Sequence, residues 1–115
     1  MEASCLFCKI VKKDIPAKIA YENEHVVAFH DLHPQSPVHV LVIPKRHLTS
    51  LAHSTEEHTE LLGHCLYAIT VVAKQLGVDQ NGYRTVINTG NDGGQTVHHL
   101  HLHLLAGRQH TWPPG

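Results

Sequence analysis

The sequence predicts an α+β fold with a five-stranded, mostly antiparallel sheet, one long helix and a short N-terminal helix. Three observations support this prediction: five short β-favouring runs, one long run with helical periodicity, and turn residues between the runs. The strands cluster around a single helix instead of alternating with several helices, as they would in a parallel sheet. The chain has 115 residues, and we expect residues 1–115 to form a single domain.

The N-terminal part of the chain predicts the short helix and a hairpin. Apolar residues recur at helical spacing in residues 5–13, and Pro16 marks the end of that segment because the residue before a proline avoids helical angles. Two β-favouring runs, residues 18–21 and 25–29, are separated by three polar residues. We therefore expect these runs to pair as a hairpin.

The middle of the chain predicts a central strand followed by the long helix. Residues 38–43 form a run rich in β-branched side chains that stops at Pro44. Residues 54–57, with the sequence STEE, match a capping box at the start of a helix. Apolar residues then recur on one face as far as Gly77, where the helix is expected to end.

The C-terminal part of the chain predicts two more strands with a glycine-rich loop between them. Residues 83–88 are rich in β-favouring residues, and residues 99–106 alternate as a half-buried strand does. The backbone N–H groups of the loop at residues 89–94 could cradle a phosphate, but the same composition is also ordinary turn chemistry. The loop alone does not decide between these two interpretations.

The charge and apolar content of the chain limit its partners. Nine Lys and Arg against ten Asp and Glu give a formal net charge of -1, so there is no basic field to attract nucleic acid. No apolar run approaches the roughly 18 residues of a membrane span, and the N-terminus lacks a basic, apolar leader. We therefore expect no nucleic-acid partner, no membrane partner and a cytoplasmic location.

Three histidines alternate with leucines near the C-terminus. In a strand, His99, His101 and His103 share one face while the leucines share the other, so the leucines can cover a core and the imidazoles can line a groove. Same-face neighbours are about 6.5 to 7 Å apart, which is too far for the three imidazoles to bind one zinc ion. The alternative is the solvated face of an amphipathic strand without a chemical role.

These histidines, with several other segments, resemble the signature of the histidine triad family. The sequence HLHLHLL at residues 99–105 is similar to the pattern His-x-His-x-His-x-x in which x is apolar. The resemblance covers almost the whole chain and is closest to the nucleotide-binding protein branch of that family. The other matching segments are Phe29-His30-Asp31, Pro34-Gln35, Pro37-Val38-His39, Leu41-Val42-Ile43-Pro44-Lys45, Asp92-Gly93-Gly94-Gln95, Gly107-Arg108-Gln109 and Trp112-Pro113-Pro114-Gly115.

The resemblance implies a purine nucleoside phosphoramidase that cleaves the P–N bond of a nucleoside 5'-phosphoramidate. On this view His101 attacks the α-phosphorus and forms a covalent nucleotidyl-histidine, which water then hydrolyses. His103 and His39 place two further imidazoles around the phosphate and stabilise the charge that develops there. Gln95 and Thr96 are candidates to bind the phosphate and to aid departure of the amine.

The resemblance also implies the residues that bind the nucleotide. Asp31 is expected to accept the ribose hydroxyls, although a turn cap explains that residue equally well. Without the resemblance, the apolar residues assigned to the base would be interpreted as ordinary core. The implied contacts are Ile19, Phe29 and Leu32 for the base and Asn88, Gln95, Thr96, His101 and His103 for the phosphate.

The pair Cys5-x-x-Cys8 supplies half of a tetrahedral zinc site. Other branches of the superfamily, including galactose-1-phosphate uridylyltransferase, complete such a site with a downstream histidine and the first histidine of the triad. By that resemblance His47 and His99 complete a structural zinc site with the two cysteines, and no cofactor is required for the chemistry itself. The alternative is a reduced cysteine pair packed on the N-terminal helix.

Three other functions remain open from the sequence. One is a dinucleoside polyphosphate hydrolase of the fragile histidine triad branch, against which the Trp112-Pro113-Pro114-Gly115 tail argues. The others are a non-catalytic metal-binding or sensing module and a nucleotide-binding adaptor that acts through partners. The resemblance further implies a homodimer that joins two sheets, with Trp112 near the partner's site as a specificity contact.

Overall fold

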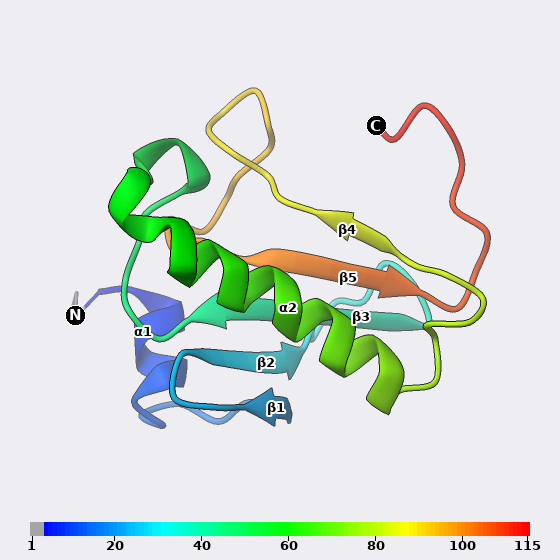
Figure 1. Cartoon of the computed structure of the whole chain (residues 1–115), viewed down its shortest axis with the longest axis horizontal. Coiled ribbons are helices and arrows are strands. Elements are labelled where there is room, and N and C mark those ends of the chain that lie inside the picture. Colours follow the sequence, from blue (N-terminus) through cyan, green and yellow to red (C-terminus); the bar gives the residue numbers. More distant parts are fainter. Residues whose placement is uncertain (1–3) are drawn as a thin grey trace.

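The computed structural model describes residues 4–115, which form one sheet of five strands between helices α1 and α2 (Figure 1). The strands lie in the order β1-β2-β3-β5-β4, and each neighbouring pair is antiparallel. The predicted α+β class, with one long and one short helix, is confirmed. In chain order the elements are α1 (Leu6–Val11), β1 (Ile19–Glu22), β2 (Val26–His30), β3 (Val38–Pro44), η1 (Leu51–His53), η2 (Glu56–His58), α2 (Thr59–Gln75), β4 (Arg84–Val86) and β5 (Leu102–Ala106).

The face of the sheet that packs against α2 holds the larger apolar core. Alternate residues of the strands point to this face, as the twofold period of a strand requires. Helix α2 contributes a stripe of small and branched side chains to the same cluster, which explains why its apolar residues recur at helical spacing. The cluster includes Val26, Ala28, Val40, Val42, Leu102 and Leu104 from the sheet and Cys65, Ala68, Ile69, Val72 and Ala73 from α2.

The opposite face of the sheet is covered only in part, by the short helix α1. Val27, Leu41 and Ile43 lie in a second cluster beneath Phe7 and Ile10 of α1. Strands β2 and β3 are therefore buried on both faces, and this explains why their sequences are continuous apolar runs without alternation. The part of this face that α1 leaves uncovered is available for a binding site.

The capping box lies one residue later than predicted and caps the 3-10 turn η2, which runs directly into α2. The N-cap of η2 is Thr55, whose backbone N–H donates to Nδ1 of His58 over 2.9 Å. Ser54, expected in that position, instead donates its hydroxyl to the carbonyl of Leu51. The predicted end of the helix is confirmed, since Gly77 follows the last turn with φ of 72°, a left-handed conformation that favours glycine.

Strand β5 is shorter than the sequence predicts, and His99 and His101 lie before it. Pairing with β3 begins at Leu102, opposite Val42, although β3 itself continues to Pro44 by pairing with β2. The residues ahead of β5 bond to other segments: the backbone N–H of Leu100 donates to Leu48, and the His99 ring contacts the Pro44 carbonyl. These bonds replace the strand pairing that the sequence predicts for this segment.

Helix α2 crosses the sheet with a buried side and an exposed side (Figure 1). Its exposed side includes Leu66 and Tyr67. None of the helices within residues 4–115 is long and apolar enough to cross a membrane.

Candidate active site and metal cluster

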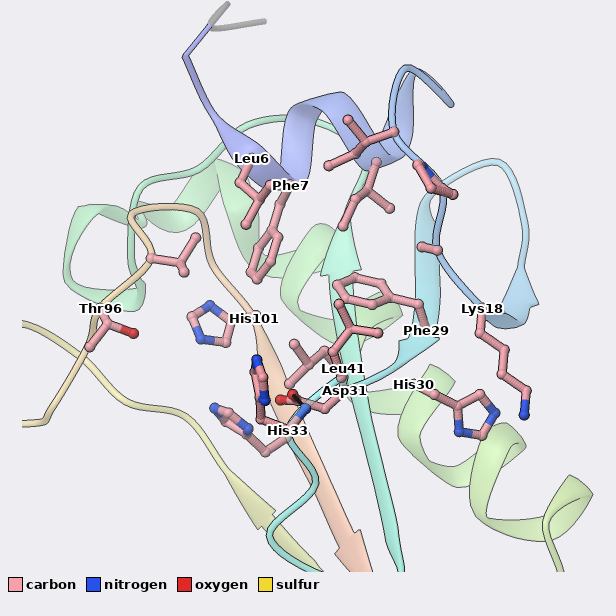
Figure 2. A pocket seen from close by; sticks show the side chains of 17 residues that line it. Leu6, Phe7, Lys18, Phe29, His30, Asp31, His33, Leu41, Thr96 and His101 are labelled. Atoms are coloured by element: carbon pink, nitrogen blue, oxygen red, sulfur yellow. Dashed lines mark hydrogen bonds between the residues drawn. The ribbon is translucent and has the colours of Figure 1, made fainter.

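A cavity of about 450 Å³ opens on the face of the sheet that α1 covers in part (Figure 2). Its wall combines apolar side chains of α1 and β2 with polar side chains from β5 and two loops. His101 and His103 lie at one end, whereas Lys18 and His30 lie at the other. A cavity of this size, apolar with a few convergent polar groups, is typical of a site for a small ligand.

The hydrogen bonds of His101 fix which of its nitrogens carries the proton. Nδ1 lies 2.8 Å from the carbonyl oxygen of His99. A carbonyl only accepts, so Nδ1 must donate, and the neutral ring then has an unprotonated Nε2. Burial lowers the pKa of His101, which favours this neutral form. The ring therefore presents a nucleophilic nitrogen on the wall of the cavity.

His39 and His103 form a hydrogen-bonded relay in which each ring is protonated on Nε2, whereas His101 is protonated on Nδ1. The backbone N–H of Gln35 donates to Nδ1 of His39 over 3.0 Å, so the proton of a neutral His39 is on Nε2. That Nε2 lies 2.9 Å from Nδ1 of His103 and donates to it, which leaves the proton of His103 on its own Nε2. His103 therefore offers a hydrogen-bond donor beside the nucleophilic nitrogen of His101.

The electrostatic environment keeps both relay histidines neutral near pH 7. Burial lowers the pKa of His39, against the opposing effect of the Asp31 carboxylate. Burial, together with the neighbouring His101 and His39, lowers the pKa of His103 to about 4. Neutral rings are the condition for the donor and acceptor roles derived from the hydrogen bonds.

Asp31 caps a turn and also lines the cavity. One carboxylate oxygen accepts the backbone N–H of His33 over 2.8 Å and so caps the turn. The other lies 3.5 Å from Nε2 of His39, and the residue lines the cavity. The turn cap holds the carboxylate in place, and its remaining acceptor capacity faces the ligand space.

The glycine-rich loop is held together by side chains that the sequence assigned to the ligand. The amide of Gln95 accepts from the N–H of Gly90 and donates to the carbonyls of Thr49 and Val97. Asn88 donates to the carbonyl of Gly93 over 2.7 Å. In this structure both amides brace the loop.

Thr96, the next residue after Gln95, lines the cavity as expected. Gly93 could not be replaced without displacing the loop, because an added Cβ would lie 2.3 Å from the carbonyl oxygen of Thr89. The loop is thus a rigid support that brings Thr96 to the histidine end of the cavity.

The apolar wall of the cavity differs in part from the sequence prediction. Phe29 and Leu32 line it as expected. Ile19 does not: it is 39% exposed on the edge strand β1 and is absent from the wall. The sequence analysis missed the contribution of α1, whose Leu6, Phe7 and Ile10 all line the cavity.

A signal for this contribution was present in the sequence. Leu6 is 49% exposed although it belongs to the helix with the fewest polar residues. The apolar residues of α1 are too many for one side of a six-residue helix, and that excess indicates a second apolar contact.

The four predicted metal ligands lie together at the end of α1. The Nδ1 atoms of His47 and His99 are 3.1 Å apart, Cys5 Sγ is 3.3 Å from Nδ1 of His99, and Cys8 Sγ is 3.3 Å from Nδ1 of His47. A tetrahedral zinc ion bound at about 2.1 Å by nitrogen and about 2.3 Å by sulfur would hold these atoms about 3.4–3.8 Å apart. The donor set and its spacing fit such an ion.

The orientation of His99 supports metal binding through Nδ1. Its Nε2 lies 2.9 Å from the carbonyl oxygen of Pro44 and must donate to it, so Nδ1 carries the lone pair. The ring is fully buried, and burial lowers its pKa to about 4. Four protein ligands would leave no coordination position for water, so an ion here would be structural.

The fold of this chain is found in known proteins. The profile of the HIT domain, named for its histidine triad, matches residues 12–110 of the chain. The chain belongs to the HIT family. It is 53% identical over 115 residues to an uncharacterized HIT-like protein of Synechococcus elongatus, with 100% of both chains covered. It is also 53% identical to a 14 kDa zinc-binding protein of Zea mays, over 99% of this chain and 90% of that protein.

Solved HIT structures agree with the fold described above. A HIT family hydrolase from Legionella pneumophila superposes with a TM-score of 0.95 at 46% identity, covering 97% of this chain and 100% of that one. A histidine triad nucleotide-binding protein from Candida albicans superposes with a TM-score of 0.82 at 33% identity, covering 96% of this chain and 83% of that one. The chain therefore has the fold of HIT family hydrolases.

Proposed function

We propose that this protein is a purine nucleoside phosphoramidase, which hydrolyses the P–N bond of nucleoside 5'-phosphoramidates of the adenosine 5'-monophosphoramidate type. The observation that carries the proposal is the pair of opposite tautomers at the cavity. His101 presents an unprotonated Nε2, and His103 beside it presents an Nε2–H donor. A nucleophile next to a donor is the arrangement that attack on a phosphoryl centre requires.

The first step is attack of His101 Nε2 on the α-phosphorus. A bond forms between Nε2 and phosphorus, the P–N bond to the amine breaks, and the amine leaves after taking up a proton from solvent, to which the attacking water of the second step returns one. His103 donates its Nε2–H to a phosphoryl oxygen, while His39 holds the His103 tautomer through the relay. The carbonyl of His99 stabilises the positive charge on the His101 ring through the Nδ1–H bond.

The second step is hydrolysis of the nucleotidyl-histidine. Water attacks the phosphorus, the bond to His101 Nε2 breaks, and the ring returns to its neutral form as the monophosphate is released. Thr96 lies at the histidine end of the cavity, where its hydroxyl can contact the phosphate or the departing amine. In our proposal Asn88 and Gln95 act on the phosphate indirectly, by fixing the loop that carries Thr96.

The remaining part of the cavity is assigned to the nucleoside. Asp31 accepts the ribose hydroxyls with the oxygen that faces the ligand space. Phe29, Leu32 and the side chains of α1 form an apolar slot for the base, which accounts for a purine preference through stacking area.

The metal cluster is assigned a structural zinc ion. Cys5, Cys8, His47 and His99 would hold it, and the ion supplies cross-linking of the N-terminal helix to the segment before β5. The name of the Zea mays relative, a zinc-binding protein, supports this assignment. The reaction itself needs no metal, because the steps above use only side chains of the cavity.

We further propose that residues 1–115 act as one HIT domain in the cytoplasm and form a homodimer. The Cys5-x-x-Cys8 pair is assigned to metal binding and not to a disulfide, which is suited to a reducing compartment. Trp112 is 82% exposed, which is compatible with a contact to a partner subunit. Light scattering or sedimentation of the purified protein measures the oligomeric state.

The decisive experiment follows hydrolysis of adenosine 5'-monophosphoramidate by the wild-type protein and by His101→Ala. We expect the variant to lose activity by about a thousandfold or more, because the nucleophile is removed. His98→Ala is the matched control, since His98 is exposed beside the triad and should keep wild-type turnover. Mass spectrometry of quenched wild-type protein should show a nucleotidyl adduct that the His101 variant lacks.

Three outcomes would redirect the proposal. Equal turnover by His101→Ala removes the assignment of the nucleophile. Faster turnover of a diadenosine polyphosphate than of the phosphoramidate would favour the dinucleoside polyphosphate hydrolases, and absence of turnover with tight AMP binding would favour a non-catalytic nucleotide-binding module.

A further inference from the structure

Helix α1 contributes to two sites at once. Its N-cap Cys5 and its Cys8 supply both sulfur atoms of the metal cluster. Leu6, Phe7 and Ile10, which lie between or just after these ligands, form part of the cavity wall. The metal cluster and the proposed slot for the base therefore share one rigid element of six residues.

This helix has few means of holding its own position. A helix of six residues is far below the length of about 12 residues at which isolated helices become marginally stable. Its N-cap acceptor is the sulfur of Cys5, a weak acceptor. Beyond the helix, the ion pair of Lys13 with Glu22 is largely exposed and contributes little. The interactions left to hold α1 in position are the burial of Phe7 and Ile10 and the metal cluster.

Phe7 connects α1 to the residues of the cavity. Its ring lies edge-on to His101 with centroids 5.2 Å apart, and at 5.5 Å from Phe29 (Figure 2). It also lies 6.0 Å from His99, one of the metal ligands. A shift of α1 would therefore move the wall of the slot and its contact with the nucleophile together.

The phosphate end of the cavity is anchored differently. His103 is on β5, which pairs with β3, and its partner His39 is on β3 itself. The ring of His99 contacts the carbonyl of Pro44 at the end of β3, and the N–H of its neighbour Leu100 donates to Leu48 in the loop after β3. At the phosphate end α1 contacts the nucleophile through Phe7, whereas at the nucleoside end α1 forms part of the cavity wall itself.

We propose that the metal ion positions α1 and thereby sets the affinity of the cavity for the nucleoside part of its ligand. The proposal rests on the nucleotide-binding function proposed above. It makes Phe7 a positioning residue between the two sites. Because linkage is reciprocal, a nucleotide must tighten metal binding by the same factor by which the metal tightens nucleotide binding.

The test compares zinc-loaded protein with protein stripped by a chelator, using calorimetric titration with AMP and with ribose 5-phosphate. We expect zinc removal to weaken AMP binding by about tenfold, within the usual range for coupled sites, and to change ribose 5-phosphate binding less than about twofold. Cys8→Ser should behave as stripped protein does. Cys65→Ala is the matched control, because Cys65 is a thiol on the buried side of α2 and is remote from the cluster.

Two further measurements do not depend on a folded zinc-free state. In the loaded wild-type protein, saturating AMP should slow the removal of zinc by a chelator, and ribose 5-phosphate should not. In Phe7→Ala the protection by AMP should disappear while zinc still binds. A third measurement applies where the stripped protein stays folded: amide exchange over residues 6–11 should rise on zinc removal.

The outcomes separate this inference from the function on which it rests. AMP binding that is the same with and without zinc, or zinc release that AMP does not slow, overturns the coupling and leaves the phosphoramidase proposal intact. Equal weakening of AMP and ribose 5-phosphate overturns the assignment to α1. Failure of loaded protein to bind AMP removes the proposed function, and the coupling with it.

Discussion

The two faces of the sheet are built from the same strands but have different roles: one forms the larger apolar core and the other forms the cavity. On the α2 face, Leu102 and Leu104 of β5 are at most 1% exposed and lie in the larger apolar cluster. On the α1 face, His103 from the same strand borders the cavity and contacts His39 from β3. The comparison shows that alternate positions of one strand can separate stability from chemistry, because successive side chains point to opposite faces of the sheet.

The cavity face is also less densely covered than the core face. Helix α2 has 17 residues and spans the sheet, whereas α1 has six and covers one end (Figure 1). The uncovered area is the space in which a ligand fits. The predictions below test whether the two faces are as separate as this comparison implies.

The largest expected effect on stability is on the α2 face. Leu102→Ala removes a side chain that is 1% exposed in the apolar cluster, and we expect it to lower the free energy of unfolding by about 2–5 kcal/mol. Urea denaturation followed by circular dichroism measures this loss. Leu32→Ala makes the same chemical change at the cavity mouth, where the side chain is 88% exposed, and should cost less than about 0.5 kcal/mol. Similar losses in the two variants would contradict the separation of the faces.

The second effect is a pH dependence of stability that originates on the cavity face. Burial lowers the pKa of His103 in the folded protein to about 4, whereas in the unfolded chain it is about 6.5. Between these values the unfolded chain takes up a proton that the folded protein does not, so stability falls as the pH is lowered. Above about pH 6.5 and below about pH 4 the effect of this group is constant.

The matched variant for this prediction is His103→Gln, which cannot titrate. The difference in unfolding free energy between pH 7 and pH 4 should be larger in the wild type than in the variant, by an amount of the order of 2 kcal/mol. Denaturation curves at several pH values measure it. Parallel curves for the two proteins would show that His103 is not the group responsible.

The smallest effect distinguishes the observed wall of the cavity from the wall that the sequence predicted. Leu6→Ser should raise KM for the phosphoramidate by about fivefold and leave kcat nearly unchanged, because an apolar contact with the base is lost while the histidines are untouched. Ile19→Ser should leave both constants at wild-type values, since Ile19 lies outside the wall. A larger change in KM for Ile19→Ser than for Leu6→Ser would restore the original interpretation.

Most of the fold followed from local patterns. The twofold and 3.6-residue periods of the apolar residues marked the strands and α2, and Gly77 marked the end of that helix. The capping box was misplaced by one residue, because Ser54 and Thr55 are equally good caps and only the contact of Thr55 with His58 distinguishes them. The length of β5 was overestimated, since its pairing with β3 stops at Leu102 and the residues before it contact Leu48 and Pro44, which are distant in sequence.

The site was predictable to the extent that its residues carry distinctive chemistry. The alternating histidines and the cysteine pair were singled out because few structural roles require them in that spacing, whereas Asp31 was assigned only through the resemblance to the histidine triad family. The apolar wall was only partly predicted, because an apolar side chain looks the same in a core as in a binding slot. Gln95 shows the opposite difficulty, since its amide was assigned to the ligand while backbone groups of Gly90, Thr49 and Val97 occupy it.

The sequence by itself determined the alternation that sends leucines to the core and histidines to the cavity, because that alternation is a property of the extended chain. It also determined the chemical identity of the possible metal ligands. Only the tertiary structure decided which ring nitrogens are free, because each tautomer depends on a carbonyl or amide from a distant segment: His99 for His101, Gln35 for His39 and Pro44 for His99. A proton on one nitrogen or the other makes an imidazole a nucleophile or a donor, so the roles of these histidines are set by contacts that no local pattern records.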